Sequence, residues 1–178
     1  KTLRKRNGNV ERFLIFFGAS DPENLTALAI EALSSPVLES IFLDVVIGVN
    51  HPNGDEIRAQ CEMRGQAQFH TRLPHLADLM AKADMCIGAG GSTTWERLCL
   101  GLPTIIVSNA DNQVSTSSAL GEDGYVEYLG KSSTLLSEVL AQKILQLTSS
   151  PKKLVQQSIA GQELVDGMGV QRVMEKIL

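Results

Sequence analysis

Aromatic residues are scarce in this chain, and so is any excess of positive charge. Phe, Trp and Tyr together make up 4% of the 178 residues, which leaves little material for stacking the bases of a single-stranded nucleic acid. The formal net charge of −4 also argues against a general polyanion-binding surface. We therefore expect no nucleic-acid partner, and any phosphate group must be held locally by backbone amides and hydroxyl groups.

Membrane spans, targeting segments and metal-ligand clusters are missing as well. No apolar run approaches the length of a transmembrane helix, and no signal peptide is visible. The three cysteines have no Cys-x-x-Cys spacing, so a reduced, cytoplasmic protein is expected. No histidine and carboxylate have the spacing of metal ligands, so we expect neither a metal ion nor a cofactor.

The chain opens on Lys1 without a methionine and continues through a basic, polar stretch to Asn9. Such a stretch is typical of a surface linker rather than of a first structural element, so residues 1–9 are expected to be the remnant of a linker in a longer protein. A cleaved tag or a trimmed natural terminus is the alternative interpretation. Residues 10–178 are expected to form one compact domain, since their number suffices for a single hydrophobic core.

Short apolar runs alternate with longer helical stretches along the chain. The six predicted strands are Arg12–Gly18, Phe42–Ile47, Ala67–Thr71, Asp84–Gly88, Thr104–Ser108 and Tyr125–Leu129. Helices are expected between them, the first one capped by Asp21 with Pro22 at its first position. The remainder, Ser133–Leu178, is predicted to be helical with breaks at Pro151 and around residues 166–169. This order predicts an α/β fold with a doubly wound, mostly parallel six-stranded sheet.

The glycine-rich segment Gly88–Glu96 leaves a buried strand and enters a helix, at the sheet edge where doubly wound folds bind ligands. Glycines allow close approach of a ligand to the backbone, and a helix start offers unpaired amides to an anion. The hydroxyl groups of Ser92, Thr93 and Thr94 lie at the same place, which strengthens the prediction of an anion site. The segment lacks the Gly-Lys-Ser/Thr of a triphosphate-binding loop and the third glycine of the dinucleotide fingerprint.

Some of these residues also have a purely structural interpretation. Thr93 and Glu96 have the spacing of a capping box, in which both side chains only satisfy amides at a helix start. The histidines are not expected to do chemistry directly. His51 lies in a turn where it is expected to be solvated, His70 lies within a strand, and His75 begins a helix.

Several motifs together resemble a known family. Gly88–Glu96, Gly101–Pro103 and Ala110–Gln113 look like the Rossmann-like C-terminal domain of GT-B-type nucleotide-sugar enzymes, and Phe17–Thr26 resembles the first-strand loop of that group. The resemblance is to the UDP-sugar hydrolases of pseudaminic acid biosynthesis, which remove UDP from a diacetamido-trideoxy sugar, and to their spore-coat polysaccharide relatives. The GlcNAc transferases that make the lipid-linked peptidoglycan precursor are more distant relatives.

The resemblance implies roles for particular residues. Glu96 would accept hydrogen bonds from the ribose hydroxyls, and the backbone near Leu73 would read the uracil edge. Contacts to the diphosphate and the sugar are implied for Ser20, Gly90, Gly91, Ser92, Thr93, Asn112 and Gln113. The catalytic histidine of this group belongs to the N-terminal domain, so no catalytic residue is expected in this chain. The implied partners are UDP or a UDP-sugar and a missing N-terminal domain.

Three functions remain open at this point. The first is the UDP-binding half of a nucleotide-sugar hydrolase in the biosynthesis of pseudaminic acid or another surface glycan, inactive as an isolated chain. The second is the donor-binding domain of a GT-B glycosyltransferase that uses a UDP-sugar. The third is a non-catalytic nucleotide-binding subunit. The N-terminal domain would decide between the first two, because it supplies the base and the acceptor pocket.

Overall fold

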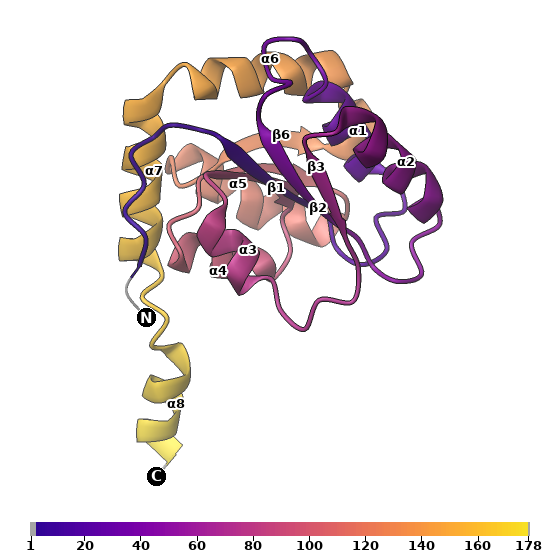
Figure 1. Cartoon of the computed structure of the whole chain (residues 1–178). Helices are drawn as coiled ribbons and strands as arrows, with labels where there is room; N and C mark the ends of the chain where they lie inside the picture. Colours follow the sequence, from indigo (N-terminus) through magenta and orange to yellow (C-terminus); the bar gives the residue numbers. More distant parts are fainter. Residues whose placement is uncertain (1–2, 178) are drawn as a thin grey trace.

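The computed structural model describes residues 3–177 as a parallel sheet with helices on both faces (Figure 1). The strands are β1 (Arg12–Phe16), β2 (Phe42–Val46), β3 (Ala67–His70), β4 (Met85–Ala89), β5 (Thr104–Ser108) and β6 (Glu127–Lys131). The α-helices are α1 (Leu25–Ala32), α2 (Gly54–Arg64), α3 (Ala77–Lys82), α4 (Thr93–Cys99), α5 (Val114–Glu122), α6 (Ser137–Thr148), α7 (Pro151–Leu164) and α8 (Gly169–Ile177). Two short 3-10 helices are η1 (Asp111–Gln113) and η2 (Ser132–Thr134). Lys1 and Thr2 of the expected linker, and Leu178 of the expected last helix, lie outside the described residues.

The strand order is β3-β2-β1-β4-β5-β6, and every neighbouring pair is parallel. At the centre, Leu14 of β1 lies opposite Asp44 of β2 on one side and Cys86 of β4 on the other. The order of strand addition reverses between β1 and β4, so the loops that follow these two strands diverge and leave a crevice. The predicted doubly wound, Rossmann-like fold is confirmed.

Both faces of the sheet are buried, which explains the nearly continuous apolar runs of the strands. Phe13 and Ile15 point into a large core shared with α1, α2 and α6. Leu14 points the other way, toward α3, and Ile106 of β5 packs on the same side against α4 and α5. Helix α7 runs along α4, where Gly161 allows close contact with the backbone.

The segment before β1 lies against the domain, across the ends of α3 and α4. Arg6 is buried, and its guanidinium donates hydrogen bonds to the carbonyl oxygens of Met80 (2.8 Å) and Leu100 (2.7 Å). Burial lowers the pKa of Arg6 to about 10, so the side chain stays cationic at neutral pH. The assignment of residues 1–9 to a linker stays a prediction.

Some details of the predicted secondary structure are wrong. Helix α1 begins at Leu25, so Pro22 precedes the helix instead of occupying its first position. The last strand begins at Glu127 rather than at Tyr125, because the amides of Tyr125 and Val126 bond to the carbonyl of Leu120 and so finish helix α5.

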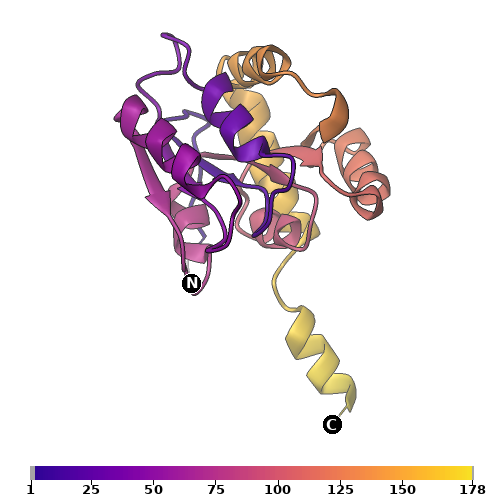
Figure 2. The same ribbon diagram turned by 90° about the vertical axis from the view of Figure 1, so that its right-hand side faces the viewer.

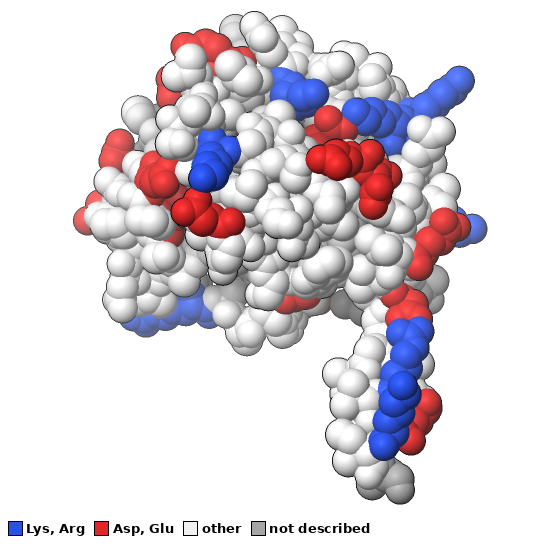
Figure 3. All heavy atoms as spheres, turned by 180° about the vertical axis from the view of Figure 1, so that it is seen from behind, with Lys and Arg blue, Asp and Glu red and all other residues white. Residues whose placement is uncertain are grey.

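Helix α8 stands away from the body of the domain (Figures 1 and 2). Its apolar residues Val170, Val173, Met174 and Ile177 recur at helical spacing and are all exposed. Figure 3 shows charged side chains along one side of this helix and uncharged atoms along the other. Among residues 3–177, no helix combines the length and the apolar character needed to cross a membrane.

Candidate functional site

The carboxyl ends of β1, β4 and β5 surround a cavity of about 510 Å³. The residues that line it come from the ends of these strands and the loops that follow them: Phe16, Phe17, Gly18, Ser20, Pro22, Ala89, Gly91, Ser92, Thr93, Asn109, Ala110 and Gln113. The cavity lies where the strand order reverses, which is the usual ligand position in this fold. It brings together part of the predicted site, namely Ser20, Gly91, Ser92, Thr93 and Gln113.

The start of α4 leaves backbone N–H groups without acceptors beside this cavity. Within the described part of the chain, no group accepts a hydrogen bond from the amides of Gly91, Ser92 or Thr93. The following amides, of Thr94 and Trp95, bond back into the same turn at 3.0 and 3.2 Å. Ser92 is the N-cap residue, and its side chain caps no amide. Unpaired amides and free hydroxyl groups at one helix start suit an anion.

The glycines of this segment serve two different purposes. A Cβ atom on Gly88 would lie 2.4 Å from the carbonyl oxygen of Phe16, and one on Gly90 would lie 2.2 Å from Oγ of Ser117. Packing inside the protein therefore requires glycine at position 88, and at position 90 a larger residue would displace the Ser117 side chain. A Cβ atom on Gly91 would meet no heavy atom within 4 Å, and its φ is not positive, so neither the fold nor the backbone conformation requires glycine there.

Gln113 joins the loops that follow β4 and β5. Its Oε1 accepts hydrogen bonds from the amides of Gly90 and Asn109, both at 3.2 Å. Asn109 in turn donates from Nδ2 to the carbonyl oxygen of Phe17 at 3.2 Å, which ties in the loop after β1. The oxygen of Gln113 is thus used within the protein, while its Nε2 has no acceptor among the described residues. Our sequence-based prediction missed Asn109, although its place directly after a buried strand was the available signal.

The loop between β1 and α1 is held by a buried carboxylate. Asp21 accepts hydrogen bonds from the amides of Leu25 (3.0 Å) and Thr26 (2.8 Å), so it does cap α1, but from a position well before the helix. His51 is buried with Nε2 3.6 Å from the Asp21 carboxylate, so the expectation of a solvated His51 is wrong. The turn after β2 folds back over the β1–α1 loop, where a Cβ atom on Gly48 would lie 2.2 Å from the carbonyl oxygen of Ala19. This contact explains the burial.

Four of the residues implied by the family resemblance lie outside the cavity lining. Gly90 lies between the lining residues Ala89 and Gly91 but is not part of the lining itself. Leu73 is exposed between β3 and α3, and Asn112 is exposed on η1. Glu96 is exposed on α4 and borders a separate hollow of about 670 Å³ between α4 and residues 164–172. Thr93 is the first helical residue rather than the N-cap, and Glu96 caps no amide among the described residues, so the capping box does not form.

The remaining histidines lie apart from the cavity. His70 contacts the buried Asp44 through Nε2 at 2.9 Å, and Arg12 donates to the same carboxylate from Nε at 2.5 Å. His75 is exposed and precedes α3, which begins at Ala77, so the expectation that it begins a helix is wrong. No cluster of three or more metal-ligating side chains occurs among residues 3–177.

Arg97 is a buried residue that our sequence-based prediction also missed. Its side chain is 1% exposed and lies on the side of β4 away from the large core, behind the glycine-rich loop. Nη2 donates to the carbonyl oxygen of Ala89 (2.6 Å) and to Oγ1 of Thr94 (2.8 Å), and Nη1 lies 3.6 Å from Sγ of Cys86. Burial raises the pKa of the Cys86 thiol, so this neighbour is neutral at physiological pH.

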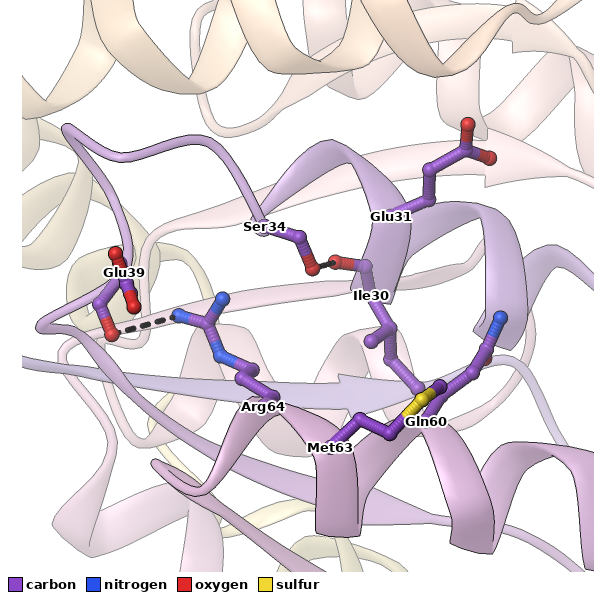
Figure 4. A pocket seen from close by; sticks show the side chains of 7 residues that line it. All are labelled: Ile30, Glu31, Ser34, Glu39, Gln60, Met63 and Arg64. Carbon is purple, nitrogen blue, oxygen red and sulfur yellow. Dashed lines mark hydrogen bonds between the residues drawn. The ribbon is translucent and has the colours of Figure 1, made fainter.

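A further hollow, of about 370 Å³, lies between α1 and α2 (Figure 4). It is lined near the last turns of both helices, at the opposite edge of the sheet from the βα loops. Its arginine, Arg64, donates to the carbonyl oxygens of Leu38 and Ile41, both at 2.9 Å, and to those of Leu33 and Glu39. The guanidinium is thus used to hold the chain after α1, and this hollow is not the favoured ligand site.

The fold and the crevice at its switch point define a Rossmann-like domain of the GT-B type. Residues 13–172 match the family described as the glycosyltransferase family 28 C-terminal domain, and the chain belongs to this family. It is 28% identical over 173 residues to the spore coat polysaccharide biosynthesis protein SpsG of Bacillus subtilis (strain 168), covering 97% of this chain and 50% of that protein.

Transferases are among the other relatives. The chain is 28% identical over 138 residues to the UDP-N-acetylglucosamine--N-acetylmuramyl-(pentapeptide) pyrophosphoryl-undecaprenol N-acetylglucosamine transferase of Exiguobacterium sp. (strain ATCC BAA-1283 / AT1b), covering 75% of this chain and 38% of that protein. The crystal structure of Acinetobacter baumannii MurG superposes with a TM-score of 0.76 at 18% identity, over 95% of this chain and 49% of that one. The chain thus spans about half the length of SpsG and of the MurG chain, and a smaller share of the Exiguobacterium transferase.

The expectation of a hydrolase is wrong, because the matched family is a glycosyltransferase domain and its relatives include transferases. The motifs that suggested a hydrolase, Gly88–Glu96 and Ala110–Gln113, surround or flank the crevice of this domain. Such motifs describe a bound group. They carry no information on whether water or another hydroxyl group attacks it.

Proposed function

We propose that this chain is the donor-binding half of a GT-B glycosyltransferase that uses a UDP-sugar. The observation that carries this proposal is the row of unpaired amides at Gly91, Ser92 and Thr93, which faces the switch-point cavity of a family 28 C-terminal domain. The diphosphate would accept hydrogen bonds from these amides and from the adjacent hydroxyl groups. In the transition state the same donors stabilise the charge that develops on the leaving UDP.

The other residues around the cavity would position the rest of the donor. Ser20 and the free Nε2 of Gln113 would donate to phosphate or sugar oxygens, since both residues line the cavity. Glu96, one turn along α4 from Thr93, would accept hydrogen bonds from the ribose diol. The backbone after β3, near Leu73, would contact the uracil ring, and Asn112 on the exposed η1 would approach the sugar from outside.

A second half of the same polypeptide would supply the acceptor site and the catalytic base. Two observations support this part of the proposal. Relatives such as SpsG are about twice as long as this chain, and α8 exposes an apolar face without a partner among the described residues. We expect the N-terminal half to pack against that face of α8, and the isolated chain to bind the donor without turnover.

Calorimetric titration of this chain with UDP, CMP and GDP tests the proposed site. We expect UDP to bind with a dissociation constant of about 1 mM or tighter, and both other nucleotides more weakly. If no UDP binding is detected at millimolar concentrations of UDP, the proposal is wrong. Repeating the titration with 2′-deoxy-UDP isolates the ribose contact, because Glu96→Ala should abolish the preference for UDP. Glu62→Ala, which removes an exposed carboxylate from α2, is the matched control and should keep that preference.

A further inference from the structure

The cavity that would hold a diphosphate contains no cationic side chain. None of the described residues that line it is a lysine or an arginine, and its polar side chains are the neutral Ser20, Ser92, Thr93, Asn109 and Gln113. A diphosphate carries more than one negative charge, and neutral donors alone leave that charge uncompensated in a partly buried site. A nearby positive charge would stabilise such an anion, and the buried Arg97 lies directly behind the loop.

Arg97 supplies that charge from beneath the glycine-rich segment. Its hydrogen-bond partners are a carbonyl, a hydroxyl and a thiol, none of which carries a formal charge, and its Nε has no partner among the described residues. An arginine side chain stays protonated in proteins, so burial without a carboxylate is costly for the fold. Nη2 donates to the carbonyl oxygen of Ala89 at 2.6 Å, and Ala89 lines the cavity, so the charge lies against the backbone that borders the ligand space.

The same side chain also orients the loop. Arg97 donates to the carbonyl of the Ala89–Gly90 peptide, while the amide of that peptide donates to Oε1 of Gln113 on the opposite side. The peptide plane is thus held from both ends. The residues with free amides, Gly91 to Thr93, directly follow this fixed peptide and line the cavity.

We propose that Arg97 is a positioning residue that makes this site select a diphosphate, by placing an unpaired buried positive charge behind the Gly88–Thr93 backbone. The inference rests on the proposed function, because it assumes that the cavity is the nucleotide site. It adds that the selectivity for phosphate groups over the nucleoside comes from a side chain that the ligand does not touch.

NMR titrations of the chain with UDP and with uridine test this inference through the ratio of the two affinities. Arg97→Met should weaken UDP binding about tenfold and uridine binding by less than about twofold, whereas Arg97→Lys should keep most of the ratio. A merely structural arginine would lower both affinities together, and that result would overturn the inference. Arg64→Met is the matched control, since it removes a partly buried arginine at the other end of the sheet and should leave the ratio unchanged.

A second pair of variants covers the case in which Arg97→Met does not fold. Thr94→Asp places a carboxylate where Oγ1 now accepts a hydrogen bond from Arg97, and so neutralises the charge of the guanidinium without removing it. Thr94→Asn is the control, because asparagine has the shape of aspartate without its charge. The UDP-to-uridine ratio should be about tenfold lower in the Asp variant than in the Asn variant. Equal ratios would overturn the inference. If the wild-type chain binds uridine and UDP equally, the inference fails, and if it binds neither, the proposed function itself fails.

Discussion

At the amino end of the sheet, arginine side chains donate to carbonyl groups at the ends of three helices: Arg64 to Leu33 after α1, and Arg6 to Met80 of α3 and Leu100 after α4. At the carboxyl end, the first amides of α4 have no acceptor among the described residues, and the nearby Arg97 has no charged partner. These helix C-termini are thus paired with cations, whereas at the carboxyl end the start of α4 is left open, unlike the start of α1, which Asp21 caps. The difference separates the end of the domain whose polar groups are satisfied within the fold from the end at which we propose that a ligand binds.

The two kinds of glycine in the β4–α4 segment give the sharpest test of this contrast. Gly88→Ala should lower the free energy of unfolding by about 3 kcal/mol, because the new Cβ would overlap with the Phe16 carbonyl and the Arg97 guanidinium. Gly91→Ala should leave stability within about 0.5 kcal/mol and weaken UDP binding, because the added methyl group enters the ligand space. Urea denaturation and calorimetry measure the two effects, and a stable Gly88→Ala protein would break the contrast.

Removing an arginine from the amino end should affect stability alone. Arg6→Met leaves the carbonyl groups of Met80 and Leu100 without their donor, so we expect a loss of about 2 kcal/mol in the free energy of unfolding. UDP affinity should not change. Lys5→Met removes a neighbouring exposed charge and is the control, with no expected loss of stability. A drop in UDP affinity for Arg6→Met would show that the two ends of the sheet are coupled.

Substitutions of Gln113 test whether charge or loop position controls nucleotide binding at the carboxyl end of the sheet. Gln113→Glu keeps an oxygen that can accept from the amides of Gly90 and Asn109, but it adds a negative charge beside the cavity. UDP binding should weaken about tenfold, with uridine binding nearly unchanged. Gln113→Ala should instead weaken both ligands, because the loops after β4 and β5 lose their bridge. Identical behaviour of the two variants would contradict the distinction between charge and loop position.

The smallest effect is expected from Cys61, in the last part of α2 close to Arg64. Burial raises the pKa of its thiol from 9.0 to about 11. The folded state therefore favours the neutral thiol, so this contribution to stability is complete below pH 9.0 and is lost as the pH rises toward 11. Urea midpoints measured from pH 8 to pH 10.5 should fall more steeply for the wild type than for Cys61→Ala. Parallel curves would show that the thiol does not titrate with unfolding.

The sequence predicted the alternation of strands and helices well, because parallel strands that are buried on both faces leave long apolar runs between glycine-rich turns. It also predicted that Gly91, Ser92 and Thr93 lie at a helix start, and binding of an anion there stays a prediction. It could not predict the burial of His51, since this depends on a turn folding over a loop that lies far away in the sequence. Arg97 was missed for a related reason: within its helix nothing distinguishes an arginine that faces solvent from one that faces β4.

The choice between water and an acceptor hydroxyl could not be read from these residues either. The side chains around the cavity are proposed to donate to a leaving group, and such donors would serve both reactions equally. The acidic residue of the Ala110–Gln113 motif, Asp111, does not decide between them. In the structure it is exposed and paired with Lys131 at 2.7 Å, and this hydrogen bond lowers the pKa of its carboxyl group.

The position of β1 at the centre of the sheet has a consequence for how the protein folds. Residues 12–16 pair on one side with β2, and on the other side they pair with residues 85–89, which lie far along the chain. Closing such a long loop is slow compared with forming local helices, so the crevice between the loops after β1 and β4 should be among the last features to form. In a refolding experiment, recovery of nucleotide binding should therefore lag behind recovery of helical circular dichroism.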